Sequence, residues 1–212
     1  WGETGARLET PYIEHRFELN RLPRMVSDGR RGVLVAWLDG QSGRPNPSVL
    51  VQRVGPDGAI QWGVDGVAVR HGANACTIPA LVADGVGGAL VFWGEWNSAG
   101  TSIQIRGQHV APAGDLLWGA EGSAISSRSF DRMPGAIPAD GGWVWANYAP
   151  AISGTPDGHG GAILCWAGSE AADLNIFAVR VASKGWLPWG REKLICSAPG
   201  EQASVVSTER RE

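Results

Sequence analysis

The stretch DGVGGALVFW, residues 84–93, recurs as DGRRGVLVAW at residues 28–37 and as DGHGGAILCW at residues 157–166. In each copy an Asp-Gly pair precedes a short apolar run, and the Asp stands nine positions before the Trp. An Asp-Gly pair before an apolar run is typical of a β-hairpin, because glycine adopts positive φ without a steric penalty. The three copies therefore predict three hairpins of one design.

A second recurrent segment follows each copy and ends in a Trp-Gly pair. It reads QRV at 52–54 with WG at 62–63, QHV at 108–110 with WG at 118–119, and VRV at 179–181 with WG at 189–190. The two tryptophans of one repeat are 25 positions apart in the first two repeats and 23 apart in the third. Such regular spacing indicates one structural unit used three times.

Each unit is predicted to contain four short strands. In the second repeat these are residues 79–83, 89–93 and 103–110, followed by a fourth strand that carries Trp118. Four-stranded units repeating at about 50 residues favour an all-β, β-propeller-like fold with antiparallel blades. We expect one domain over 1–212, with full repeats at about 24–73, 79–125 and 150–198. The recurrent residues are expected to be structural, filling the space between blades or forming turns: Trp37, Trp62, Trp93, Trp118, Trp166, Trp189, Asp28, Asp84 and Asp157.

The two motifs, approximately D-G-x-G-G-x4-W and Q-R-V-x3-G-x3-W-G, resemble the bacterial Trp-containing β-propeller repeats. This resemblance covers well over half of the chain. It implies an exported or surface interaction role more often than catalysis, and it names no partner. The chain shows neither a WD dipeptide nor a clear Asp-box, which sets it apart from better-known propellers.

The ends and one insertion fall outside the three repeats. Residues 1–20 and 199–212 are expected to form a split closing blade, because Trp1-Gly2 matches Trp62-Gly63; the alternative is that they belong to parts of a further blade. Residues 126–149 are an insertion relative to the other repeats, and we expect them in a loop on one rim, where rigid scaffolds carry function.

Composition excludes several functions. The 212 residues carry a formal net charge of −3, with 18% charged residues, so the basic footprint of a nucleic-acid-binding protein is absent. No apolar run approaches the roughly 20 residues of a membrane helix. Cys76, Cys165 and Cys196 lack metal-binding spacing, and two alternatives stay open: a disulfide between Cys76 and Cys196, or buried thiols. We expect no metal, no cofactor and an extracellular, cell-surface or periplasmic location.

Aromatic residues that the repeat does not explain are the candidate binding residues. The main hypothesis is a non-enzymatic interaction or scaffold module, an exported or surface-assembly subunit that binds a protein partner through rim loops. The alternative is a lectin-like glycan-binding propeller, in which indole rings stack on sugars while neighbouring polar groups bind hydroxyls. Packing of the loop on its own domain is the third explanation. The candidates are Trp96, Asn97, Trp143, Trp145, Asn147, Tyr148 and Trp186.

A glycan-active enzyme is the weakest of the functional hypotheses. It would need a pair of converging carboxylates, for which the chain offers Glu95, Glu121, Glu170, Asp131 and Asp173 without fixing their separation. Serine-nucleophile and phosphate-binding motifs are missing. We therefore assign no catalytic residue.

Overall fold

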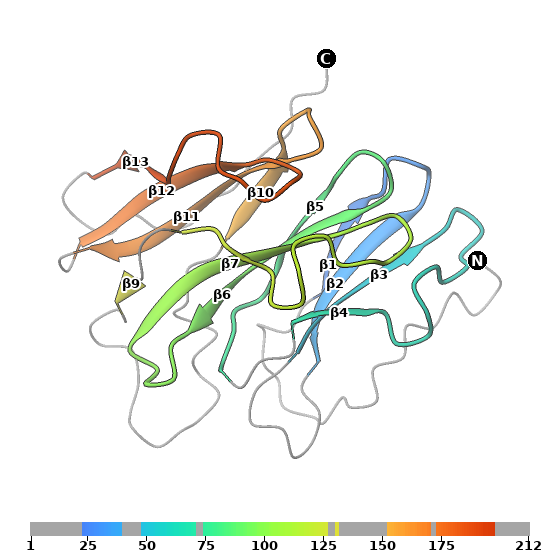
Figure 1. The fold of residues 1–212 in the computed structure, drawn as a ribbon, viewed down its shortest axis with the longest axis horizontal. Helices are drawn as coiled ribbons and strands as arrows, with labels where there is room; N and C mark the ends of the chain where they lie inside the picture. Colours follow the sequence, from blue (N-terminus) through green and yellow to red (C-terminus); the bar gives the residue numbers. More distant parts are fainter. Residues whose placement is uncertain are drawn as a thin grey trace.

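The computed structural model describes residues 23–39, 48–70, 74–126, 130–131, 152–170 and 173–197, which form three antiparallel sheets and no helix. Sheet A contains β1 (Arg24–Ser27), β2 (Val33–Asp39), β3 (Ser48–Val54) and β4 (Val67–Arg70). Sheet B contains β5 (Ala80–Ala83), β6 (Ala89–Trp96), β7 (Ser102–Val110) and β8 (Ser123–Ala124), and β9 (Phe130–Asp131) also pairs with β7. Sheet C contains β10 (Ser153–Pro156), β11 (Ala162–Glu170), β12 (Asp173–Val181) and β13 (Lys193–Cys196). Sheet B lies between the other two (Figure 1).

Over the described residues, the prediction of an all-β fold built from four-stranded antiparallel units is confirmed, with β9 as a fifth strand in sheet B. Residues 1–20, 199–212 and nearly all of the 126–149 insertion lie outside the described residues, so the closing blade stays a prediction. One detail is wrong: Trp118 precedes the fourth strand of its sheet instead of lying in it. The reason is that the Trp118 N–H donates to the Gln108 side chain, 2.9 Å away, and not to a neighbouring strand.

The Asp of each Asp-Gly pair fixes the hairpin between the first two strands of its sheet. In sheet B, Oδ1 of Asp84 accepts hydrogen bonds from the N–H groups of Val86 and Gly88, both at 2.8 Å. Asp28 and Asp157 accept the equivalent bonds in sheets A and C. The motif therefore recurs because a carboxylate satisfies two turn N–H groups that the sheet leaves unpaired.

In sheets A and B, a buried glutamine binds the backbone of the Trp-Gly pair that ends the second recurrent segment. Gln52 is fully buried; its amide donates to the Gly63 carbonyl at 2.6 Å and its oxygen accepts from the Trp62 N–H at 2.9 Å. Gln108 makes the same two contacts with Gly119 and Trp118. Sheet C has Val179 at this position, so it lacks the glutamine that ties the third strand to the Trp-Gly pair.

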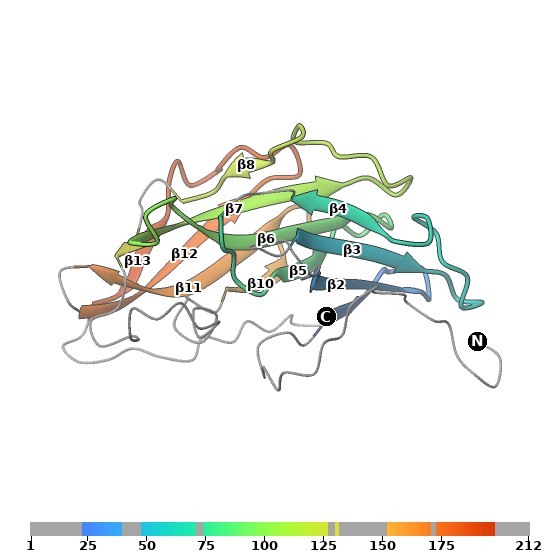
Figure 2. The ribbon, with the colours of Figure 1, turned by 90° about the horizontal axis from the view of Figure 1, so that it is seen from below.

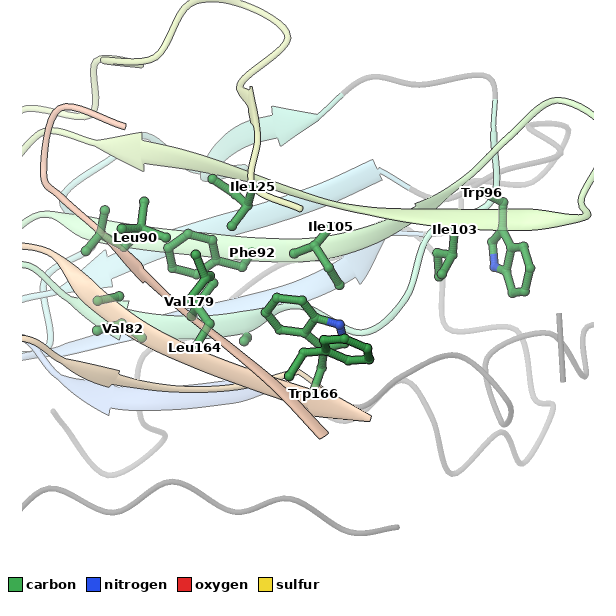
Figure 3. Packing of buried hydrophobic residues seen from close by; sticks show 14 residues of the cluster. Val82, Leu90, Phe92, Trp96, Ile103, Ile105, Ile125, Leu164, Trp166 and Val179 are labelled. Atoms are coloured by element: carbon green, nitrogen blue, oxygen red, sulfur yellow. The ribbon is translucent and has the colours of Figure 1, made fainter. Parts of the chain in front are cut away.

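The sheets pack face to face through two apolar clusters (Figure 2). Trp93 of sheet B faces sheet A, whereas Phe92, the next residue back, faces sheet C; both are fully buried. Figure 3 shows the cluster between sheets B and C, where Phe92 lies near Leu164 and Val179. The second strand of sheet B is apolar without alternation because both of its faces are covered.

A tryptophan also connects each sheet to the next. The indole N–H of Trp62 in sheet A donates to the Pro112 carbonyl of sheet B at 3.0 Å, and that of Trp118 in sheet B donates to the Ser183 carbonyl of sheet C at 2.9 Å. A Cβ added to Gly114 would lie 3.3 Å from the Trp62 ring, so glycine lets the ring approach the turn. We call this arrangement of indole, carbonyl and turn glycine the inter-sheet joint.

Candidate functional site

The connection between β12 and β13 carries the most exposed tryptophan of the described residues. Trp186 is 59% exposed, whereas the other described tryptophans are buried or half-buried. At the same place in the repeat, sheets A and B have Ala59 and Asp115. The Trp186 ring therefore has no counterpart in the other two repeats. Among the predicted binding residues that the structure describes, Trp186 is the aromatic residue with an exposed ring.

The backbone that carries Trp186 is held by several hydrogen bonds. The Ala182 N–H donates to the Trp186 carbonyl at 2.9 Å, and Gly185, with φ of +84°, closes the turn by donating to the Ala182 carbonyl at 2.8 Å. The Ser183 carbonyl accepts from the Trp118 indole of sheet B. The exposed ring thus stands on a turn whose shape is fixed from two sheets, as a preorganised binding residue requires.

Polar side chains lie at the same end of sheet C. Register pairs Ala162 with Val181, which places the 157–161 turn beside the 182–186 turn. There Oδ2 of Asp157 accepts from Nε of Arg180 at 2.9 Å, and the Arg180 side chain is 31% exposed. His159 and Lys184 are also exposed in these two turns. An exposed ring with cationic and imidazole groups nearby can bind a polar ligand that has an apolar face.

His109 links sheets B and C, a role that the sequence analysis did not predict. Its Nε2 lies 3.1 Å from Oδ2 of Asp84, and its Nδ1 lies 2.8 Å from the Ser183 carbonyl of the next sheet. Arg53 and Arg180 stand at the equivalent positions of sheets A and C and bind their turn Asp. The signal was present in the repeat alignment, since His109 replaces an Arg that the other two units share.

The turn carboxyls are stabilised in their ionised form. Burial by itself raises the pKa of Asp28, but the N–H groups of Arg30 and Gly32 and the Arg53 guanidinium outweigh burial and lower that pKa. The pKa values of Asp84 and Asp157 are lowered for the same reasons, with His109 and Arg180 as the side-chain partners. The hydrogen bonds and ion pairs of these carboxylates are thus all made to groups that hold the turns.

Trp96 and Asn97 do not have the exposed ring and available amide that the glycan hypothesis expects of them. Trp96 is 5% exposed and packs beside Ile103 in the core (Figure 3). Oδ1 of Asn97 accepts the Thr101 N–H at 2.8 Å and its amide donates to the Thr101 hydroxyl at 2.9 Å. Both side chains serve packing and turn formation, an arrangement that favours a structural role. Trp143, Trp145, Asn147 and Tyr148 lie outside the described residues.

The carboxylates considered for catalysis are not brought together as a described pair. Glu95 forms ion pairs with two arginines: Oε1 accepts a hydrogen bond from Nη2 of Arg70 at 3.1 Å, and Oε2 lies 3.2 Å from Nε of Arg106. Glu121 is exposed. The side chains of Glu170, Asp131 and Asp173 are not among those described. Glu95 therefore acts as an ion-pair partner between sheets A and B.

The cysteines and charged groups show neither a disulfide nor a metal cluster in the described part of the chain. Cys76, Cys165 and Cys196 form no disulfide, so the Cys76–Cys196 pairing is wrong; of the three thiols Cys76 is buried as the alternative predicted, whereas Cys165 and Cys196 are half-buried. Burial raises the pKa of the Cys76 thiol to about 11, despite the nearby Arg70. Among the described residues no group of three or more His, Cys, Asp or Glu could hold a metal ion. No helix long and apolar enough to cross a membrane occurs there either.

Comparison with known proteins gives likeness of fold only. No protein-family model and no curated protein matches the chain. The fold is similar to an endo-arabinase from Bacteroides thetaiotaomicron, with a TM-score of 0.48 and 15% identity over 88% of this chain and 66% of the arabinase. It is also similar to a glycosyl hydrolase from Bacteroides ovatus, with a TM-score of 0.41 and 12% identity over 86% of this chain and 50% of the hydrolase. The chain therefore spans less than two thirds of either protein.

These comparisons correct the main functional hypothesis of the sequence analysis. The solved structures that resemble this fold are described as enzymes acting on glycans, and neither is described as a protein-binding scaffold. The scaffold hypothesis is therefore wrong as the leading interpretation. The likeness is too distant to transfer an activity, so any glycan-related function must be argued from this chain's own residues.

Proposed function

We propose that this chain is a carbohydrate-binding module of the β-propeller type, whose ligand stacks on the indole ring of Trp186. The observation that carries the proposal is the ring itself, 59% exposed on a turn fixed by hydrogen bonds. A large exposed indole exposes apolar area to water, and it is tolerated at low cost where a ligand covers it.

The chemistry around the ring suits a sugar. The C–H face of a pyranose or furanose ring is apolar and packs against an aromatic face, while its hydroxyl groups need hydrogen-bond partners at the edge. His159 and Lys184 supply such partners in the two neighbouring turns. The propeller-type architecture is supported by the repeated four-stranded sheets stacked face to face through the inter-sheet joint.

The test is binding of defined oligosaccharides of arabinose, xylose and glucose, measured by calorimetry on the wild-type chain and on Trp186→Ala. We expect one of these sugars to bind the wild type, and Trp186→Ala to weaken binding roughly 5- to 150-fold, since stacking on an aromatic ring contributes on the order of 1–3 kcal/mol. Leu117→Ala is the matched control, because Leu117 is 52% exposed at the end of the equivalent connection in sheet B. Circular dichroism checks that both variants are folded.

A second pair of variants separates Trp186 from the insertion. Trp143→Ala with Trp145→Ala removes the two insertion tryptophans that the sequence analysis favoured. Loss of binding in this double variant with unchanged binding by Trp186→Ala would move the site to the insertion and refute the role of Trp186. Absence of binding by the wild type to every sugar tested would refute the proposal as a whole.

A further inference from the structure

The segment that carries Trp186 differs in charge from its counterparts in the other two sheets. The segments that follow the third strand align without gaps over 55–66 in sheet A, 111–122 in sheet B and 182–193 in sheet C. The first two each expose two carboxylates and contain no cationic residue: Asp57 and Asp65 in sheet A, and Asp115 and Glu121 in sheet B. The repeated architecture therefore does not require a positive charge in this segment.

In sheet C the exposed charges of the segment are positive. Lys184 stands at the position of Asp57, and Lys184, Arg191 and Lys193 are all exposed. The acid of the segment, Glu192, is only 5% exposed. The exposed charge thus changes from two carboxylates in each of sheets A and B to three cations in sheet C, although the whole chain has a net charge of −3.

Two cationic side chains belong to the turn region of the Trp186 ring. Lys184 lies in the turn itself, two residues before Trp186. The Ala182 N–H donates to the Trp186 carbonyl at 2.9 Å, and Arg180 precedes Ala182 by two residues, so these two side chains share one face of the chain entering the turn. The Arg180 guanidinium is held at Nε by Asp157, yet its side chain is 31% exposed. An ammonium and a positioned guanidinium therefore accompany the ring.

The carboxylate at this end of sheet C is occupied by three hydrogen bonds. Oδ1 of Asp157 accepts from the N–H groups of His159 and Gly161 at 2.8 Å, and Oδ2 accepts from Nε of Arg180 at 2.9 Å. Arginine and lysine side chains are donors only, whereas the hydroxyl groups of a neutral sugar both donate and accept. A carboxylate or sulfate group on a sugar offers acceptors and a negative charge. The groups near Trp186 therefore suit a negatively charged sugar better than a neutral one.

We propose that the ligand of the Trp186 site is an anionic glycan, whose sugars carry carboxylate or sulfate groups. One sugar ring stacks on the indole, and its anionic group is bound by Lys184 and Arg180. Arg191 and Lys193 add to the attraction at longer range. Neutral sugars bind the same ring by stacking, but more weakly. This inference rests on the proposed function, because it concerns the ligand of the same ring.

The test compares one oligosaccharide in a charged and a neutral form, which separates the effect of charge from that of stacking. Oligogalacturonate and its methyl ester form one pair, and a sulfated oligosaccharide and its desulfated form are the other. Calorimetry at low salt should show the charged form of at least one pair binding roughly 3- to 30-fold more tightly to the wild type, since a few exposed ion pairs each contribute modestly. In about 1 M salt, where the screening length is about 3 Å, the two forms should bind alike. The pair that shows the difference identifies the anionic group.

Two variants with the same change of charge distinguish a local effect from a general one. Lys184→Asp gives sheet C the residue that sheet A has at Asp57, and it should lower the ratio of charged to neutral affinity at least about 3-fold. Arg30→Asp is the matched control, because Arg30 is exposed in the first turn of sheet A, and sheet B lies between that sheet and sheet C. We expect Arg30→Asp to leave the ratio within about 2-fold of wild type. Circular dichroism checks that both variants are folded.

The outcomes separate this inference from the proposed function. Equal affinities for the charged and neutral forms at low salt, both weakened by Trp186→Ala, would overturn the inference and leave the carbohydrate site in place. An equal loss of preference in Arg30→Asp and Lys184→Asp would also overturn it, because the preference would then reflect the charge of the whole chain. Binding of none of the charged or neutral sugars would refute the proposed function and this inference with it.

Discussion

The Asp-Gly turns offer a differential test of how each sheet is held, using Asp28→Asn and Asp84→Asn. In both variants the amide oxygen can still accept the two turn N–H groups that Oδ1 accepts at 2.7–2.8 Å. What changes is the group that replaces Oδ2. The new NH2 faces the guanidinium of Arg53 in sheet A and the imidazole of His109 in sheet B.

The two partners respond differently to that change. Arg53 has no acceptor to offer, so Asp28→Asn sets donor against donor and loses contacts at 3.0 Å from both Nε and Nη2. Losing hydrogen bonds to a charged group costs about 1.5–3 kcal/mol, and Arg53, with a side chain only 14% exposed, cannot recover all of it from water. Neutral His109 can accept the new N–H at Nε2 and still donate from Nδ1 to the Ser183 carbonyl. We expect Asp84→Asn to cost about 1 kcal/mol or less.

Urea denaturation followed by circular dichroism at pH 7 measures both variants against wild type. Asp28→Asn should lower the free energy of unfolding by at least about 1 kcal/mol more than Asp84→Asn, equivalent to a Tm lower by roughly 2–4 °C for a chain of this size. Asp28→Ala and Asp84→Ala, which also remove the turn acceptor, are the controls and should both be strongly destabilising. If Asp84→Asn proved as costly as Asp28→Asn, the argument from the imidazole's two hydrogen-bonding states would be refuted.

Two further predictions concern the three turn aspartates and two glycines of other turns, Gly63 and Gly122. The folded-state pKa values of the three turn aspartates lie below the unfolded value of about 3.9, so the stability that these carboxylates contribute is complete at neutral pH and is lost as pH falls below about 4. Tm recorded from pH 7 to pH 3 should therefore drop below about pH 4. A Tm that does not change with pH would contradict this prediction. Gly122→Ala should lower the free energy of unfolding by more than about 2 kcal/mol, because φ of Gly122 is +64° and the new Cβ would collide with the Gly107 carbonyl. Gly63 also has a positive φ, +79°, but no atom lies within 4 Å of the new Cβ, so Gly63→Ala should cost only about 1 kcal/mol. Equal urea midpoints for the two alanine variants would show that the backbone near Gly107 can move aside.

The repeat made most of the described fold predictable from sequence. Three features recur in each repeat: the Asp at the position of Asp84, the apolar run after it and the pair of tryptophans. Three occurrences of one local pattern distinguish it from a chance match. The boundary of the fourth strand was not predictable, because it depends on a tertiary contact: the Gln108 side chain takes the Trp118 N–H before the strand begins. Local propensity carries no information about that competition.

The candidate site was only partly predictable for a related reason. Trp96 and Trp186 look alike in sequence, as aromatic residues outside the repeat pattern, yet one is 5% and the other 59% exposed. Exposure is decided by the neighbouring sheet: β6 extends far enough for Trp96 to reach the core between sheets B and C, whereas the turn after β12 carries Trp186 beyond it. Single-sequence patterns cannot rank two such residues.

A repeated architecture provides internal controls that single-copy folds lack. At the position of Gln52 and Gln108, sheet C has Val179; at that of Arg53 and Arg180, sheet B has His109; at that of Ala59 and Asp115, sheet C has Trp186. The first replacement loses a link that the other sheets keep, and the second preserves its link to the turn Asp by other chemistry. The third replacement, Trp186, adds an exposed indole ring that does not take part in the packing of one sheet on another. A residue that the architecture neither needs nor repeats is where a function specific to this chain should be sought first, which is why Trp186, and not one of the recurrent tryptophans, is the residue to substitute in a binding experiment.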